Sequence, residues 1–258
     1  MNRQNSCGVV ILFALEREAA PFRRLARDLC LMRATLAQAR SVSEGIAIPR
    51  SRFGLVSNQT AGSIEQIHIH VTGVGRRCTQ VSLGQILSEQ HSPRCIIAAG
   101  FCGALQPKLR VGDIVVAREV VDVAGHKWPT NSVPIPQDRQ CGRILTANGL
   151  IANAAEKQRL GEFHKADAVD MESAAVAEAC TARGVPFQAV RAVSDRVDTE
   201  LSPELVRLLS GGNISAWKAF RALLRKPALM GEFRRLARDT RLAARNLADA
   251  LVNIVQLQ

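Results

Sequence analysis

Tyrosine is absent from this chain of 258 residues, and aromatic residues together make up only 4% of it. No recognised nucleic-acid-binding motif is present either. The net charge of +11 would suit a nucleic-acid partner, but the scarcity of aromatic residues and the lack of a motif argue against one. The sequence therefore favours a protein that does not bind nucleic acid.

Long apolar runs and paired cysteines are also missing. No apolar stretch reaches the roughly 18 residues of a membrane span. Residues Met1 to Cys7 are polar, and Glu16 interrupts the apolar stretch that starts at Val9, so no signal peptide is expected. The seven cysteines form no Cys-x-x-Cys pair and have no histidine at zinc spacing. We expect reduced, mostly buried thiols, no metal, no cofactor and a cytoplasmic protein.

The chain does contain a regular alternation of apolar segments. This alternation predicts an α/β fold, a three-layer α/β/α sandwich around a twisted sheet. Residues 39–63 and 128–140 are poorly patterned and are expected as an irregular hairpin and a loop. The expected strands are 8–14, 66–71, 95–100, 111–117 and 187–193, and the expected helices include 16–33 and 78–90.

Two acids lie at the two ends of one predicted helix–strand unit. Glu172 is at or near the start of an alanine-rich helix that ends at Gly184, and Asp195 follows the strand Phe187 to Val193. Ligands of open α/β sheets bind outside the carboxyl ends of the strands, so the pair indicates a site for a polar small molecule. Each acid alone is equally compatible with a structural role, as a helix-dipole partner or a turn cap.

The residue order across this unit resembles the nucleoside phosphorylase and nucleosidase superfamily, and most of all its methylthioadenosine/S-adenosylhomocysteine nucleosidase branch. The resemblance implies a nucleoside phosphorylase-like fold with a mixed sheet, and it covers roughly residues 8–198. The segments that carry it are Met171-Glu-Ser-Ala-Ala175, Val190-Arg-Ala-Val-Ser-Asp195, Phe13-Ala-Leu-Glu-Arg-Glu-Ala19, Val71-Thr-Gly-Val-Gly75, Ala99-Gly-Phe-Cys-Gly-Ala-Leu105 and Leu109-Arg-Val-Gly-Asp-Ile-Val-Val116.

The expected chemistry assigns a role to each of three acids. Breaking a purine–ribose bond leaves a cationic sugar and an anionic base. Asp195, if protonated, could donate a proton to purine N7, and Glu172 suits the ribose hydroxyls and the positive charge of the sugar. Glu18 matches the residue that orients the attacking water in hydrolytic relatives, although a first-turn acid is also favoured by the helix dipole. The catalytic candidates are Glu18 and Asp195.

The resemblance also implies a set of substrate contacts. The backbone at Ile151 would read the base edge, Met171 would pack under the ribose, and Leu150 replaces an aromatic residue that stacks on adenine in many nucleosidases. Ala98 and Phe101 stand where many phosphorylases bind phosphate, which disfavours phosphorolysis unless Arg76 and Arg77 substitute. The expected substrate-binding residues are Phe101, Leu150, Ile151, Met171, Glu172 and Ser194.

The C-terminal region differs from the compact nucleosidases. From Ser215 to Gln258 there are nine basic residues and three acidic ones. We expect a catalytic domain over residues 1–211 and a basic helical extension over 212–258, which resembles that of hopanoid-associated phosphorylases. Those relatives imply an adenosylated lipid as substrate. A basic amphipathic helix could rest on an anionic membrane, or it could simply pack on the domain.

Two classes of function remain at this point. The first is an enzyme that cleaves purine N-glycosidic bonds, with water or inorganic phosphate as co-substrate and a methylthioadenosine-like nucleoside or an adenosylated hopanoid as substrate. The second is a basic module that binds nucleic acid or membrane without catalysis. The first class also implies a small-molecule purine nucleoside as partner and a homodimer or higher oligomer.

Overall fold

The computed structural model describes residues 8–28, 35–38, 52–60, 63–89, 93–130, 140–209 and 229–256. The predictions for residues 1–7, 29–33, 39–51 and 131–139 lie outside this part of the chain. The predicted domain boundary between residues 211 and 212 also lies outside it.

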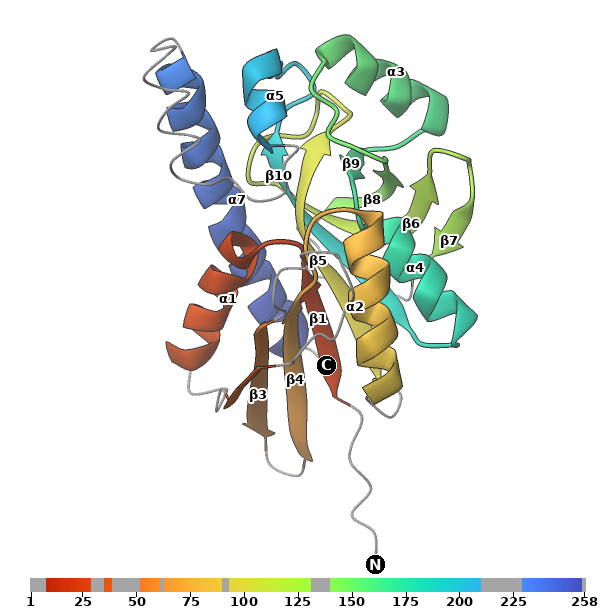
Figure 1. Ribbon diagram of the computed structural model, residues 1–258, viewed down its shortest axis with the longest axis vertical. Coiled ribbons are helices and arrows are strands. Elements are labelled where there is room, and N and C mark those ends of the chain that lie inside the picture. The colour runs from red at the N-terminus through yellow and green to blue at the C-terminus, as the bar shows by residue number, and fades with distance from the viewer. Residues whose placement is uncertain are drawn as a thin grey trace, which may run out of the picture.

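One mixed sheet of ten strands forms the centre of the described structure (Figure 1). The order of its strands is β10–β6–β8–β9–β5–β1–β4–β3–β2, with β7 beside β6. The strands are β1 (Val9–Phe13), β2 (Thr35–Gln38), β3 (Arg52–Thr60), β4 (Ser63–Val71), β5 (Cys95–Ala104), β6 (Ile114–Asp122), β7 (Lys127–Pro129), β8 (Gln140–Thr146), β9 (Ala168–Asp170) and β10 (Phe187–Asp195).

The pairing of strand β10 with both β5 and β6 closes part of this sheet on itself. The strands β5, β10, β6, β8 and β9 pair in a ring, and β1 to β4 continue from β5 as an open sheet. Parallel pairing of β1 and β10 with β5 brings the carboxyl ends of three strands to one edge. This edge is where the predicted site residues are expected.

Helices cover both faces of the sheet, which confirms the predicted three-layer α/β fold. On one face lie α1 (Glu16–Asp28) and α7 (Leu229–Gln256), and on the other lie α2 (Arg76–Glu89) and α4 (Ser173–Ala182) (Figure 1). The helices α3 (Ala154–His164) and α5 (Pro203–Leu209) follow β8 and β10.

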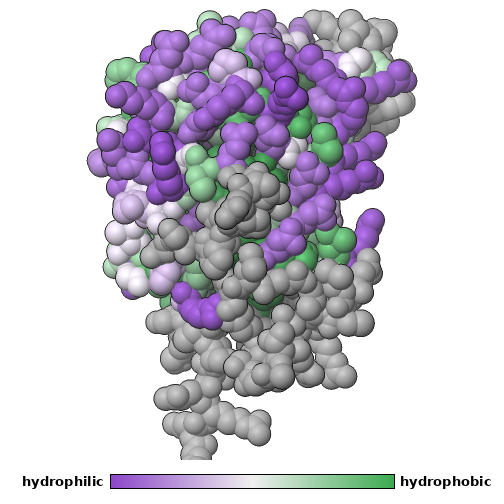
Figure 2. Space-filling model, turned by 180° about the vertical axis from the view of Figure 1, so that it is seen from behind, coloured by the Kyte–Doolittle hydropathy of each residue, from purple (hydrophilic) through white to green (hydrophobic). Residues whose placement is uncertain are grey.

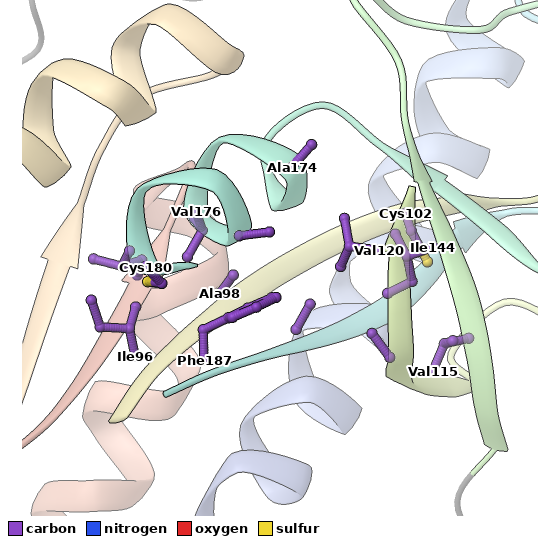
Figure 3. Close-up of a cluster of buried hydrophobic side chains, with 14 of the residues drawn as sticks. Ile96, Ala98, Cys102, Val115, Val120, Ile144, Ala174, Val176, Cys180 and Phe187 are labelled. Atoms are coloured by element: carbon purple, nitrogen blue, oxygen red, sulfur yellow. The ribbon is translucent and has the colours of Figure 1, made fainter. Parts of the chain in front are cut away.

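The sequence explains why these layers form. Strand β1 reads Val-Val-Ile-Leu-Phe and is buried along its whole length, as expected of a parallel strand covered on both faces. Helix α4 is rich in alanine and packs closely on β5, with Val176 and Cys180 lying beside Ile96 and Ala98 (Figure 3). Small side chains on this helix allow the close approach.

Several predicted bounds change in the structure. Strand β6 begins at Ile114 rather than Val111, because Val111 to Asp113 form a turn: Gly112 has φ +91° and Asp113 accepts a hydrogen bond from the Arg110 N–H. Strand β3 lies within the segment expected to be an irregular hairpin or loop, and the short strand β7 overlaps the start of the expected loop at Trp128 and Pro129. Each pairs with the strand that precedes or follows it directly in the chain, β3 with β4 and β7 with β6.

Candidate active site

Glu18 is buried where helix α1 leaves strand β1. Its Oε2 accepts a hydrogen bond from the Leu15 N–H at 2.9 Å, which supports the turn before the helix. Its Oε1 accepts from the Phe101 N–H of β5 at 3.2 Å, so the carboxylate also reaches across to the edge of the sheet. Only 3% of the residue is exposed, and burial raises the pKa of this carboxyl group. Glu18 therefore does more than complement its own helix dipole.

Glu172 occupies the N-cap position of helix α4 but does not cap that helix with its side chain. Its Oε1 instead accepts a hydrogen bond from the Gly75 N–H at 2.8 Å. Gly75 has φ +90°, a backbone conformation that favours glycine, and this turn aims its N–H at the carboxylate. Burial raises the pKa of Glu172 to about 7, against the opposing effect of the nearby Arg191 guanidinium.

Arg191 joins the two glutamates and was not among the predicted site residues. Its side chain is 2% exposed, and its Nη1 lies 3.8 Å from Glu172 Oε2. A Cβ added to Gly100 would lie 2.4 Å from Arg191 Nη1 and 3.3 Å from Glu18 Oε2, so the guanidinium and Glu18 meet over this glycine. An arginine between the apolar residues Val190 and Ala192 of the buried strand β10 is the sequence signal that could have identified it.

Asp170 holds the Arg191 guanidinium in place. Its Oδ2 lies 2.5 Å from Arg191 Nη2 and accepts a hydrogen bond from the Ser173 N–H at 2.9 Å. Its Oδ1 accepts from the Thr146 hydroxyl at 2.7 Å. The Ser173 hydroxyl adds a further contact, 3.0 Å from Arg191 Nη2. The buried guanidinium thus has fixed partners on one side and faces the two glutamates on the other.

Asp195 lies at the same edge of the sheet, at the end of β10. Its Oδ2 pairs with the Lys157 ammonium at 2.5 Å, and the Ser194 hydroxyl donates to its Oδ1 at 2.8 Å. A Cβ added to Gly103 of β5 would approach Asp195 Oδ2 to 3.0 Å. Gly103 is three residues along β5 from Gly100, so Asp195 and the two glutamates lie against different positions near the carboxyl end of the same strand.

The remaining predicted residues surround these acids in different ways. The Ser194 hydroxyl contacts Asp195. Met171, which stands between Asp170 and Glu172 in the sequence, is half-buried. Ile151 packs on a small apolar cluster with Leu105 and Leu160. Leu150 beside it is 40% exposed. Phe101 contacts Glu18 through its backbone, while its side chain packs against the core beneath α1 and α7.

The possible phosphate-binding substitutes, Arg76 and Arg77, do not form an ion pair with Glu18, Glu172 or Asp195 in the described residues. Arg76 pairs with Glu178 at 2.7 Å and lies 3.6 Å from Asp122, and Arg77 is exposed. Within the described part of the chain, no group of three or more histidine, cysteine, aspartate or glutamate residues could hold a metal ion. Of the five described cysteines three are buried, and burial raises the pKa of the Cys95 thiol to about 11.

Comparison with known proteins identifies the family. The family model described as the phosphorylase superfamily matches residues 9–138 and 131–209. The chain belongs to this superfamily, and the expectation of an enzyme of that class is confirmed.

Individual relatives agree with this assignment. The chain is 26% identical over 208 residues to a 5′-methylthioadenosine/S-adenosylhomocysteine nucleosidase of Pseudoalteromonas translucida, covering 69% of this chain and 87% of the relative. It is also 26% identical over 186 residues to the nucleosidase of the same name from Staphylococcus aureus, covering 62% of this chain and 81% of the relative.

Solved structures share the fold. The nucleosidase of the same name from Helicobacter pylori, complexed with a pyrrolidine inhibitor, superposes with a TM-score of 0.67 at 17% identity over 98% of this chain and 99% of that chain. Futalosine hydrolase of Helicobacter pylori has a TM-score of 0.68 at 16% identity, again covering 98% and 99%. At this identity the likeness concerns the fold, which agrees with the predicted nucleoside phosphorylase-like architecture.

Proposed function

We propose that this protein hydrolyses the N-glycosidic bond of an adenine nucleoside, with a methylthioadenosine-like nucleoside as substrate and water as nucleophile. The observation that carries the proposal is that Glu18 and Glu172 both lie beside the buried Arg191, while Asp195 lies against the carboxyl end of the same strand β5. The relatives named as nucleosidases support the same class of reaction.

The proposed roles follow the charges that develop as the bond breaks. Glu172 hydrogen-bonds the ribose hydroxyls and stabilises the positive sugar. Glu18 takes a proton from the attacking water, a role that suits a buried carboxyl group whose pKa burial raises. Asp195 delivers a proton to the departing purine. Ser194 would hold the Asp195 carboxylate in position through its hydrogen bond.

Water is favoured over phosphate by the charges around Arg191. A phosphate dianion at this place would have one guanidinium to bind, and that group already pairs with Asp170 and faces Glu18 and Glu172. Three carboxyl groups around one cation repel a second anion but accept a neutral water. Arg76, which the sequence offers as a substitute cation, is paired with Glu178.

The test is an assay of the products with and without inorganic phosphate. Methylthioadenosine, S-adenosylhomocysteine and adenosine are incubated with the protein, and free adenine and the sugar product are separated by chromatography. We expect adenine and a free sugar, at a rate that phosphate does not change. A sugar 1-phosphate as product would contradict hydrolysis, and no adenine from any of the three would contradict the function.

A second candidate is a membrane-borne substrate such as an adenosylated hopanoid, favoured by the arginines of helix α7. Arg234, Arg238, Arg241 and Arg245 recur at three- and four-residue spacing and are all exposed, so they share one outer face. The opposite face is buried in the core, so any membrane contact would be electrostatic and peripheral. No helix in the described residues is long and apolar enough to cross a membrane.

Vesicle sedimentation tests this second candidate. Binding to vesicles with anionic lipid should be strong at low salt and weaken at high salt, because salt screens the charges. It should also fall when these four arginines are replaced by glutamine, because each arginine near such a surface contributes about 1 kcal/mol of binding free energy. Replacing the exposed Arg24, Arg110, Arg118 and Arg183 instead is the matched control. No binding at low salt would contradict a membrane-borne substrate.

A further inference from the structure

Lys157 of helix α3 is a completely buried lysine to which the proposed function assigns no role. Lys157 is 0% exposed, whereas most other residues of helix α3 are exposed or half-buried. Asn153 caps this helix by accepting a hydrogen bond from the Glu156 N–H, so the helix begins one turn before the lysine and directs it inwards. A lysine is rarely buried in this way unless its charge is compensated.

Three oxygen atoms surround the Lys157 ammonium. Asp195 Oδ2 lies 2.5 Å from Nζ, the Arg196 carbonyl oxygen 2.9 Å, and the Thr199 carbonyl oxygen 3.1 Å. The three N–H groups of an ammonium therefore each have one acceptor. Only Asp195 among these partners can compensate the charge. The next carboxylate along the chain, Asp198, is bound to Arg196 instead.

The same geometry also fits the pair after a proton has moved. If Asp195 carries the proton on Oδ2, the neutral amine of Lys157 keeps two N–H groups for the two carbonyl oxygens. Its lone pair then accepts a hydrogen bond from the Asp195 O–H. No buried polar atom of this cluster loses its partner in either form. A proton can thus pass between the two groups without the cost of an unsatisfied hydrogen bond.

We propose that Lys157 is a positioning residue that supplies Asp195 with its proton, so that the Lys157–Asp195 pair together forms the acid for the leaving base. This inference rests on the proposed function. In the step, the glycosidic bond breaks and its electron pair goes to the purine. The one transferable proton of the pair passes from Lys157 Nζ to Asp195 and from Asp195 to purine N7, which leaves a neutral Lys157 amine beside the Asp195 carboxylate. Water attacks the sugar and loses a proton to Glu18. After product release Glu18 returns its proton to solvent, and Lys157 takes one back.

A change of leaving group separates this role from a structural one. A p-nitrophenyl riboside releases a stable phenolate that needs no proton, whereas adenine does. We expect Lys157→Met to lower kcat on methylthioadenosine on the order of 10²-fold or more, the usual effect of losing general acid catalysis. Its rate on the nitrophenyl riboside should stay within about threefold of the unaltered protein, since the other groups are unchanged.

A matched control is available on the surface. Lys108 pairs with Asp167 at 2.9 Å, and its side chain is 62% exposed. Lys108→Met removes the same kind of lysine–aspartate pair and should leave both rates unchanged. If Lys157→Met does not fold, Lys157→Arg replaces it, because arginine keeps the positive charge but cannot give up a proton. This variant should lose the purine rate selectively in the same way.

The double variant with Asp195→Asn gives a second readout on methylthioadenosine alone. If the two residues form one acid, Lys157→Met combined with Asp195→Asn is no slower than Asp195→Asn by itself. Equal losses on both leaving groups, or losses that multiply in the double variant, would overturn the role of Lys157. Absence of purine cleavage by the unaltered protein would instead overturn the proposed function, so the two failures are distinguishable.

Discussion

Gly100 illustrates how single residues determine the geometry of the site. It is the point on β5 where a Cβ would collide with Arg191 and lie tightly against Glu18. The guanidinium can lie beside both glutamates only because this position has no Cβ.

Substitution of Gly100 by alanine therefore tests the arrangement. The added Cβ would lie 2.4 Å from Arg191 Nη1, so the guanidinium must shift. We expect Gly100→Ala to destabilise the protein by about 1–3 kcal/mol and to abolish most activity. Gly149→Ala is the control, because no atom lies within 4 Å of its Cβ position. Urea denaturation measures the loss of stability, and release of adenine from methylthioadenosine measures the loss of activity. If both variants behave alike, Gly100 does not constrain the position of Arg191.

Glu172 gives a pH dependence of activity. Burial raises its pKa to about 7, so the carboxylate that stabilises the sugar cation forms only as the pH rises through neutrality. We expect the rate to rise with pH up to this value. Glu172→Gln should lower kcat on the order of 10²-fold, as expected for loss of an electrostatic contact in the transition state, and should flatten this limb. An unchanged rate would leave Glu172 as a helix-end residue.

The same shift predicts the opposite trend for stability. In the unfolded chain Glu172 titrates near its ordinary 4.5, below its folded pKa of about 7. Its stabilising contribution is therefore fully present below the unfolded pKa and is lost as pH rises through the folded pKa. Between about pH 5 and about pH 8 the Tm of the unaltered protein should fall more than that of Glu172→Gln. Parallel Tm profiles would contradict the raised pKa.

Elements show where sequence patterns succeed and where they stop. The helix–strand unit from Glu172 to Asp195 could be predicted because both ends have strong local signals, a glycine–proline stop and an alternating strand. Arg191 carries a sequence signal, a charged residue within a buried strand, whereas Asp170 and Lys157 could not be predicted because their roles depend on contacts far along the chain. The bounds of strand β3 could not be predicted because its glycine and asparagine residues obscure the strand pattern that pairing with β4 stabilises.

Helix α7 is the element for which the sequence left two alternatives open. From Ala243 onwards its apolar face is buried against α1, β5 and β10, so this half of the helix belongs to the core. The apolar positions Ala244, Leu247, Leu251 and Ile254 are thus not available to a membrane. Most of the described surface in the rear view is hydrophilic (Figure 2). The boundary at residue 211 stays a prediction, but removal of this helix should expose the core.

A pair of leucines on α7 tests this integration. Leu247 is 0% exposed and Leu242 is 46% exposed, on different sides of the same helix. We expect Leu247→Ala to lower the free energy of unfolding by about 2–5 kcal/mol, because it leaves a cavity in the core. Leu242→Ala should change it by less than about 1 kcal/mol. Similar small effects for both would indicate that the helix is a separate extension.

At the scale of the whole molecule, the parallel pairing of β1 and β10 with β5 brings three acids from distant segments to the carboxyl ends of these strands. Glu18, Glu172 and Asp195 arrive there from α1, α4 and β10, and the family assignment agrees with the motifs that predicted them. The homo-oligomer stays a prediction, which sedimentation velocity of the purified protein would test. The assignment of these acids to a hydrolytic reaction is the central claim.

Adenine release from methylthioadenosine by Asp195→Asn tests that claim most directly. The amide cannot pass a proton to the leaving base, so the account predicts a loss on the order of 10²–10⁴-fold relative to the unaltered protein. Circular dichroism and thermal unfolding establish that the variant is folded. A folded Asp195→Asn protein that releases adenine at a near-normal rate would contradict the account.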